Sequence, residues 1–269
     1  MATLYDFFPM IKILVLGDIV GRPGRNMLIE HLPILRQEYQ FDFVIANGEN
    51  AAAGAGITGK IAQELLSAGV DGLTLGDHAW DQKLFLEEID QLGGICRPAN
   101  YASEVPGKDS LILESKGLRM GVFTVLGRNF MGPKVDCPFR AADRLIEALA
   151  PEVDLVVAEI HAEATSEKIA FGWYLDGRAG IVFGTHTHVP TADAEVLSAG
   201  TAYISDLGMS GPYDGVLGRE KQPVIDRFLD SIPRRFPVAE GDVRLSGIIV
   251  EWDQELGRST SIEQVFWRS

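Results

Sequence analysis

The residues best suited to chemistry lie at residues 184–190, Gly-Thr-His-Thr-His-Val-Pro, which hold two of the five histidines of the chain. This segment follows residues 179–183, a short apolar run with the pattern of a buried strand. His186 and His188 are one residue apart on a strand-end turn, so their imidazoles can point at one centre or at two adjacent centres. Neutral imidazole is a common ligand of transition metals. Because an isolated His-x-His is more often a hydrogen-bonded turn, the metal interpretation depends on the rest of the chain.

Four other expected strands also end in possible ligands. They cover residues 11–16, 41–46, 72–75 and 154–160, and they are followed by Asp18, by Glu49 and Asn50, by Asp77 and His78, and by His161. Each residue alone has an ordinary explanation, such as a turn cap or a satisfied core histidine. Ligands of open α/β sheets gather at the carboxyl edge of the strands, so together these residues predict one shared site.

The donor set suits two metal ions. Seven or eight oxygen and nitrogen donors exceed the needs of one tetrahedral ion, but they match two five- or six-coordinate ions that share a carboxylate. Without a thiolate, the set favours iron, manganese or zinc. Iron is our first expectation.

The elements that would position these residues alternate at first between strand and helix, and strands dominate later. Helices are expected from after the turn at residues 17–25 to about 38, and near 58–68, 82–92, 140–150, 163–174 and 221–229. Further strands are expected at 110–114, 119–125, 203–208 and 245–252. This order predicts an α/β fold with a mixed sheet or two packed sheets. The glycine-rich turn at 17–25 lacks both the P-loop and the G-x-G-x-x-G spacing, so it predicts no nucleotide loop.

Composition limits the class of protein. With 269 residues and 46% apolar content, the chain can form a full core, and no linker divides it, so we expect one domain over 1–269 with residues 1–9 as an N-terminal extension. The net charge of −14 argues against a general nucleic-acid groove or an anionic membrane surface, but it leaves small phosphorylated substrates open. Two unpaired cysteines and no recognisable signal peptide or membrane span predict a cytoplasmic location.

Several longer motifs carry a resemblance to a known family. They are residues 17–25 (Gly-Asp-Ile-Val-Gly-Arg-Pro-Gly-Arg), 47–50 (Asn-Gly-Glu-Asn), 161–168, 176–178, 184–188 and 208–212. In this order the chain resembles the calcineurin-like metallophosphoesterases and, more narrowly, the bacterial YmdB-type phosphodiesterases. The resemblance runs from about residue 11 to near the C-terminus. It implies a four-layer αββα sandwich of the metallo-dependent phosphatase type with mixed sheets, a dimetal centre, and hydrolysis of small phosphodiesters that include 2′,3′-cyclic nucleotides. It also implies a homo-oligomer, either a dimer or a tetramer.

The resemblance assigns roles residue by residue. One metal would be held by Asp18, Glu49, Asn50 and His188, and the second by the bridging Glu49 with Asp77, His161 and His186. A hydroxide between the two ions would attack phosphorus in line, and His78 would protonate the leaving oxygen without binding a metal.

One ligand position departs from the family pattern. The family usually has Asn where this chain has Asp77. If ionised, the carboxylate adds negative charge, which should tighten cation binding, weaken Lewis acidity and repel an anionic substrate.

Four further residues are weaker candidates. Glu163 and Lys168 could orient His161, although a solvated helix face explains them nearly as well. Arg22 and Arg178 could contact the substrate phosphate or form structural ion pairs.

Two alternatives to the phosphodiesterase remain. A weakly active or inactive regulatory protein that binds metal or nucleotide would be consistent with Asp77. A metal-dependent amidohydrolase also uses His-x-His, but there the pair usually follows the first strand, so this class is disfavoured. The sequence does not decide whether RNA is a partner. A chain of net charge −14 would need a local basic path for RNA, and none can be placed in the sequence.

Overall fold

The computed structural model describes residues 10–269, and the N-terminal extension expected at residues 1–9 lies outside them. The first sheet contains β1 (Ile11–Leu16), β2 (Asp18–Ile19), β3 (Phe43–Asn47), β4 (Gly72–Thr74), β5 (Ile95–Cys96), β12 (Met209–Pro212), β13 (Val243–Asp253) and β14 (Arg258–Arg268). Its order is β2-β12-β13-β1-β3-β4-β5, and β14 pairs with β13. Strands β1, β3, β4 and β5 are parallel, whereas β13 runs antiparallel to β1, so the sheet is mixed.

The second sheet is also mixed. It contains β6 (Ser110–Ser115), β7 (Leu118–Leu126), β8 (Leu155–His161), β9 (Ile181–Thr185), β10 (Glu195–Val196) and β11 (Ala202–Ile204), in the order β10-β11-β9-β8-β7-β6. The four inner strands are parallel, and the two edge strands are antiparallel to their neighbours.

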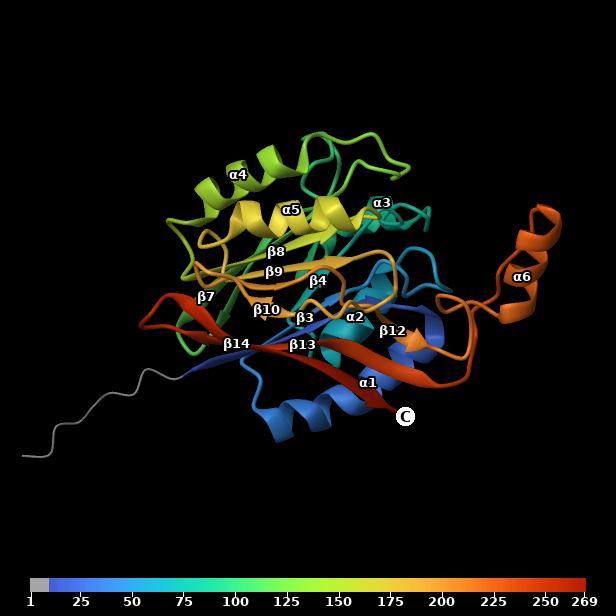
Figure 1. The fold of residues 1–269 in the computed structure, drawn as a ribbon, viewed down its shortest axis with the longest axis horizontal. Coiled ribbons are helices and arrows are strands. Elements are labelled where there is room, and N and C mark those ends of the chain that lie inside the picture. Colours follow the sequence, from blue (N-terminus) through green and yellow to red (C-terminus); the bar gives the residue numbers. More distant parts are fainter. Residues whose placement is uncertain (1–9) are drawn as a thin grey trace, which may run out of the picture.

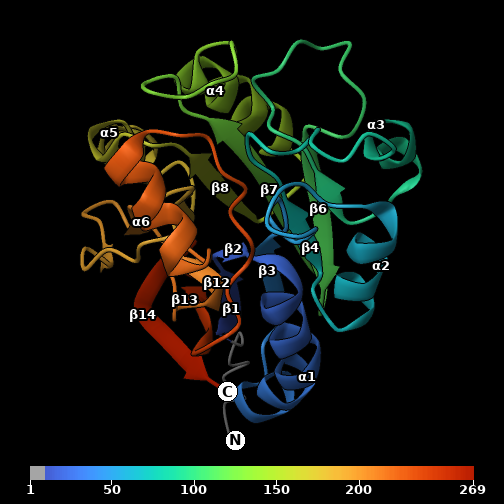
Figure 2. The same ribbon diagram turned by 90° about the vertical axis from the view of Figure 1, so that its right-hand side faces the viewer.

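Most of the helices cover the outer faces of the two sheets. The α-helices of the described residues are α1 (Gly21–Tyr39), α2 (Gly59–Ser67), α3 (Phe85–Glu88), α4 (Pro138–Leu149), α5 (Thr165–Leu175) and α6 (Lys221–Asp230). In Figure 1, α4 and α5 lie above the two sheets and α1 lies below them; α2 packs with α1 against the first sheet. Helix α6 projects from the body of the molecule beyond the ends of the strands, as Figure 1 shows, and it therefore faces the viewer in Figure 2.

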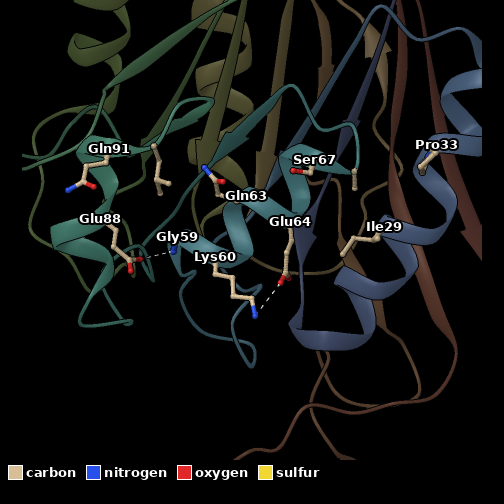
Figure 3. A pocket seen from close by; sticks show the side chains of 11 residues that line it. Ile29, Pro33, Gly59, Lys60, Gln63, Glu64, Ser67, Glu88 and Gln91 are labelled. Carbon is tan, nitrogen blue, oxygen red and sulfur yellow. Dashed lines mark hydrogen bonds and ion pairs between the residues drawn. The ribbon is translucent and has the colours of Figure 1, made fainter.

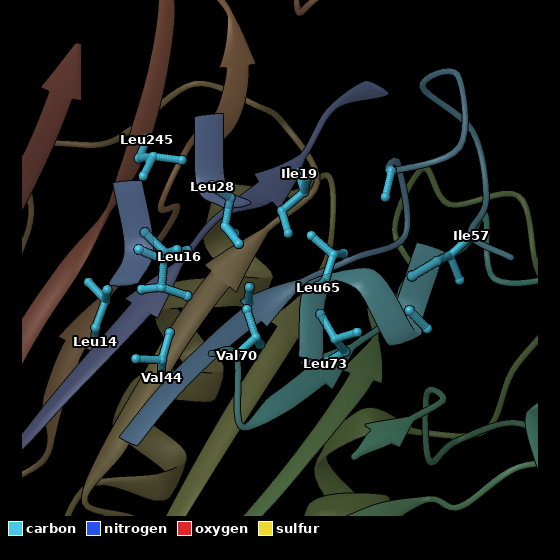
Figure 4. Packing of buried hydrophobic residues seen from close by; sticks show 14 of the residues in the cluster. Leu14, Leu16, Ile19, Leu28, Val44, Ile57, Leu65, Val70, Leu73 and Leu245 are labelled. Carbon is cyan, nitrogen blue, oxygen red and sulfur yellow. The ribbon is translucent and has the colours of Figure 1, made fainter. Parts of the chain in front are cut away.

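Three separate apolar clusters fill the three spaces between these four layers. Residues of β1 alternate between two of them, because successive side chains point to opposite faces of a sheet. Ile13 and Val15 join the central cluster between the sheets. Leu14 and Leu16 join the outer cluster under α1 and α2, which Figure 4 shows. A third cluster lies between the second sheet and α4 and α5. This arrangement confirms the expected four-layer αββα sandwich with mixed sheets.

Some elements differ from the sequence-based expectation. The helix expected over 82–92 is reduced to α3 and a 3₁₀ turn, η1 (Ile89–Gln91). The strand expected over 203–208 ends at Ile204, and the next residues turn so that Asp206 can bind neighbouring backbone. Strand β14 was not expected, because nine of its eleven residues are exposed or partly exposed and its apolar alternation is weak. Within residues 10–269, no helix is both long and apolar enough to cross a bilayer.

The parallel strands of both sheets bring their carboxyl ends together. Asn47, at the end of β3, donates a 2.7 Å hydrogen bond to Glu159 of β8 across the space between the sheets. The loops after β3 and β4 therefore face the loops after β8 and β9.

Candidate metal centre

Four of the expected ligands meet at this edge of the sheets. Glu49 follows β3, Asp77 follows β4, His161 ends β8 and His186 follows β9. One ligand atom from each lies within 4.8 Å of all the others, an arrangement that could hold a metal ion. Two sheets contribute two donors each, so the cluster forms only when the layers pack.

His161 is at the centre of this cluster. Its Nε2 atom lies 2.9 Å from Asp77 Oδ1, 3.2 Å from Glu49 Oε1 and 3.1 Å from His186 Nδ1. The His161 side chain is completely buried. Three donors around one imidazole nitrogen mark a point where a cation would find four ligands.

A second group of donors adjoins the first. His188 Nε2 lies 3.2 Å from Asn50 Nδ2 and 4.0 Å from Asp18 Oδ1. Asn50 Nδ2 also donates to Glu49 Oε1 at 2.9 Å, so Glu49 touches both groups. The structure thus brings all seven expected ligands to one place.

The donor set fits a cation on two observations. Asp18 is buried, yet its Oδ1 atom has no hydrogen-bond partner among the described residues, which is costly unless something positive binds there. The lack of a side chain at Gly76 also keeps the space at these donors clear, because a Cβ atom there would clash with them, at 2.2 Å from Glu49 Oε2 and 2.3 Å from His161 Nε2. Oxygen and imidazole donors without a thiolate suit hard or borderline ions.

The same charges perturb the acids and bases of the metal-free site. Burial, reinforced by the charges of Glu49 and other acids and opposed by His161, raises the pKa of Asp18 to about 7. Burial opposes the protonation of His161, but Glu49 and Asp77 outweigh it and raise the His161 pKa well above its ordinary value. Burial likewise opposes ionisation of Asp77, but hydrogen bonds with His161 and His186 prevail and lower its pKa. Protons therefore supply the positive charge that the carboxylates need.

A buried polar chain behind His161 was not found in the sequence. His161 Nδ1 lies 2.8 Å from Thr185 Oγ1, and the Thr185 hydroxyl donates to Glu159 Oε1. Glu159 is completely buried and also accepts the hydrogen bond from Asn47. This chain fixes the orientation of the His161 ring, as partners behind metal-binding histidines commonly do. A Glu two residues before a strand-end His was the only available signal.

The His-x-His turn has an unusual backbone. His186 has φ 94° and His188 has φ 64°, backbone values that residues other than Gly rarely adopt. Between them, the Thr187 hydroxyl and backbone N–H both donate to Asp206 Oδ2, at 2.8 and 3.2 Å. Asp206 therefore holds the turn in the conformation that separates the two imidazoles.

Lys168 acts on this turn and not on His161. Its Nζ atom donates to Asp206 Oδ2 at 2.6 Å, and both side chains are buried. The expected contact with His161 is thus replaced by an ion pair beneath the His-x-His turn. Glu163 is also displaced from its expected partner, because its Oε2 atom lies 3.3 Å from His186 Nε2.

His78 lies beside the cluster. Its backbone N–H donates to Glu49 Oε2 at 3.1 Å, and its Nδ1 lies 2.8 Å from Asp81 Oδ2. Burial opposes protonation of His78, but Glu49, Asp77 and the bond to Asp81 outweigh it and raise its pKa. The half-exposed ring remains open toward solvent.

The two arginines do not join the site. Arg178 follows α5 at the opposite end of β8 and β9, where it pairs with Asp143 at 2.7 Å and lies over the Tyr174 ring. Arg178 therefore belongs to a structural ion pair with Asp143. Arg22 is exposed in the first turn of α1 and does not line the cavity beside the cluster.

A cavity of about 560 Å³ opens onto the expected metal ligands. Glu49, Asn50, His78, His186 and His188 form part of its lining. Another cavity, between α1, α2 and the region of Glu88 (Figure 3), contains none of these residues. There, Glu88 accepts the Gly59 N–H at the start of α2, a structural role.

Comparisons with known proteins agree with this geometry. Over 255 residues the chain is 46% identical to a 2′,3′-cyclic-nucleotide 2′-phosphodiesterase of Bacillus subtilis (strain 168), covering 95% of this chain and 96% of that protein. The crystal structure of a novel phosphatase from Mycoplasma pneumoniae matches with a TM-score of 0.90 and 35% identity, over 97% of this chain and 94% of that one. A hypothetical protein from Thermus thermophilus matches with a TM-score of 0.89 and 43% identity, over 96% and 99%. The family model described as YmdB-like protein matches residues 14–265, and the chain therefore belongs to the YmdB-like protein family.

Proposed function

We propose that this protein is a dimetal phosphodiesterase that hydrolyses 2′,3′-cyclic nucleotides. The observation that carries the proposal is the convergence of Glu49, Asp77, His161 and His186 within 4.8 Å at the edge of both sheets. The 46% identity to a 2′,3′-cyclic-nucleotide 2′-phosphodiesterase supports the substrate class.

The ligands divide between two positions that share Glu49. Asp77, His161 and His186 would complete one, and Asp18, Asn50 and His188 the other. A half-turn of the Asn50 amide would present its Oδ1 in place of the Nδ2 that now faces His188. When bound, the ions would act as Lewis acids toward the phosphoryl oxygens and lower the pKa of the attacking water. Iron is our first choice, with manganese or zinc as alternatives.

His78 would supply the proton that the leaving oxygen requires. Opening the ester bond at the 2′ position leaves a 3′-phosphate and a 2′ oxygen that must be protonated. Asp81 occupies Nδ1 of His78, which leaves Nε2 to donate the proton. Asp81 would also keep the ring turned toward the cavity that His78 lines.

The proposal is tested by the product formed from 2′,3′-cAMP. The protein is stripped with a chelator, dialysed and loaded with Fe²⁺, Mn²⁺ or Zn²⁺, and products are separated by chromatography. We expect 3′-AMP from at least one loaded form and none from the stripped form. Stoichiometric binding of 2′,3′-cAMP without turnover by any loaded form would instead favour the regulatory metal- or nucleotide-binding protein, for which the Asp77 carboxylate is the motive.

Further properties belong to the same proposal. We take residues 1–269 as one metallophosphoesterase domain, supported by the central core that both sheets share. A cytoplasmic location is supported by two cysteines, Cys96 and Cys137, that form no disulfide. A homo-oligomer, a dimer or a tetramer, remains a prediction from the family resemblance, and RNA as a partner stays open.

A further inference from the structure

The cavity beside the metal ligands has a second part with a different character. Its remaining lining comes largely from residues 216–236, the segment that contains α6. Five of these residues are apolar: Val216, Leu217, Val224, Phe228 and Phe236. A cavity with polar donors in one part and apolar side chains in another suits a ligand that has one polar part and one apolar part.

Phe228 is the most exposed part of this lining. Its side chain is 83% exposed, although it belongs to the cavity wall. Among residues 10–269, no other aromatic ring pairs with it. A large apolar ring left in water is unfavourable by about 25 cal/mol per Å² of surface, so a flat partner that covers it would gain stability. Helix α6, which carries this ring, stands apart from the body of the molecule in Figure 1.

Two arginines give the same wall positive charge. The Arg219 guanidinium donates to the carbonyl oxygens of Ala53, Gly54 and Phe236, and Arg227 donates to the carbonyl oxygen of Ser231. Neither forms an ion pair with a carboxylate in the described part of the chain. These two cations offset the carboxylates of Glu49 and Glu163 in the lining of the same cavity, which lowers the repulsion that an anionic occupant would meet in a protein of net charge −14.

We propose that Phe228 is the platform on which the base of the nucleotide stacks while its phosphodiester lies at the metal ligands. The inference rests on the proposed function and makes it narrower, because it selects base-bearing diesters over simple cyclic diesters. A nucleobase is flat and stacks on aromatic side chains, and the positive charge of Arg219 and Arg227 on the same wall favours an electron-rich ring. A cavity of about 560 Å³ lies within the range of small-molecule sites.

The test compares a substrate that has a base with one that lacks it. Hydrolysis of 2′,3′-cAMP and of glycerol 1,2-cyclic phosphate is measured for the metal-loaded wild type and for Phe228→Ala, Phe228→Trp and Leu229→Ala. Binding of 3′-AMP and of inorganic phosphate is measured by calorimetry for the same proteins. Leu229 is the matched control, since it is 80% exposed on the same helix but does not line the cavity.

We expect Phe228→Ala to lower kcat/KM for 2′,3′-cAMP and affinity for 3′-AMP by about tenfold, within the range for loss of one stacked base. The reaction of glycerol 1,2-cyclic phosphate and the binding of inorganic phosphate should be unchanged. Phe228→Trp should retain the wild-type preference, and Leu229→Ala should behave as the wild type.

The failure of this inference differs from failure of the proposed function. If the wild type hydrolyses both substrates with equal kcat/KM, or if Phe228→Ala leaves the affinity for 3′-AMP unchanged, Phe228 does not stack the base. Neither result would contradict the proposed phosphodiesterase function. If no loaded form hydrolyses either diester, the proposed function fails, and the calorimetry on 3′-AMP still decides whether Phe228 binds a base.

Discussion

Lys168 and Asp206 form a buried ion pair directly beneath the two histidines of the His-x-His turn. Lys168 Nζ lies 2.6 Å from the Asp206 oxygen that also accepts both hydrogen bonds from Thr187. The other Asp206 oxygen accepts the Gly208 N–H at 2.8 Å. One carboxylate therefore joins α5, the turn after β9 and the start of β12, and it positions His186 and His188 without touching either imidazole.

Removing the Lys168 charge should therefore lower the stability of the fold. Lys168→Met keeps the apolar stem but leaves the buried Asp206 carboxylate without its cation. We expect a loss of about 3–5 kcal/mol in the free energy of unfolding, the usual cost of breaking a buried pair. Urea denaturation of the metal-free protein measures it. Lys60→Met, which removes a cation that is 87% exposed, should change stability by less than about 1 kcal/mol. Equal stability of the two variants would contradict the role of the pair.

The hydroxyl of Thr185 should control metal affinity through His161. Thr185→Val keeps the shape of the side chain but removes the link between His161 Nδ1 and Glu159. Loss of such a partner typically weakens metal binding by about 10- to 100-fold, and we expect the same here in competition with a fluorescent chelator. Thr260→Val is the control, because Thr260 is exposed on β14 and its hydroxyl donates to the Glu251 backbone carbonyl, away from the site. If both variants bind metal as the wild type does, the polar chain does not orient His161.

The Asp77 carboxylate should tighten metal binding and lower the catalytic rate, compared with Asn at the same position. Its Oδ1 atom contacts both His161 and His186, and an Asn Oδ1 could take the same position with one negative charge fewer. We expect Asp77→Asn to weaken metal binding about tenfold and to raise kcat/KM for 2′,3′-cAMP several-fold. Asp143→Asn removes a charge at the other end of the strands, where Arg178 lies, and should do neither. Tighter metal binding by Asp77→Asn would overturn this account of the carboxylate.

His78 should contribute to turnover but not to metal binding. We expect His78→Gln to lower kcat by about 10²- to 10⁴-fold, the range for loss of a general acid, with unchanged metal content. His31→Gln in α1 provides the control for removing a histidine elsewhere. Stopped-flow assays with 2′,3′-cAMP and metal analysis of the same samples give both quantities. Full activity with full metal content in His78→Gln would remove His78 from the mechanism.

The sequence predicted those features that local patterns carry. Continuous apolar runs identify buried strands such as β1 and β8, because strands covered on both faces need apolar residues throughout. The polar residues that follow these strands then indicate the shared edge. Strand β14 was not predicted from the sequence, because its side chains alternate only weakly between core and solvent. The αββα layers followed from the family resemblance rather than from periodicity.

The features that were missed depend on contacts between distant residues. Nothing local distinguishes the buried Glu159 from an exposed glutamate, since its partners Asn47 and Thr185 come from other strands. The positive φ angles of His186 and His188 likewise depend on Asp206, about twenty residues further along. Lys168 was expected to lie near His161, and only the packed structure shows that α5 directs it to Asp206.

The most direct test of the two-metal site is a titration of metal-free protein with Mn²⁺, in which turnover of 2′,3′-cAMP is measured after each addition. If Asp18, Asn50 and His188 hold one ion and Asp77, His161 and His186 hold the other around Glu49, activity should rise until two equivalents are bound and then remain constant. Saturation at one equivalent, or turnover that does not depend on added metal, would contradict the dimetal centre.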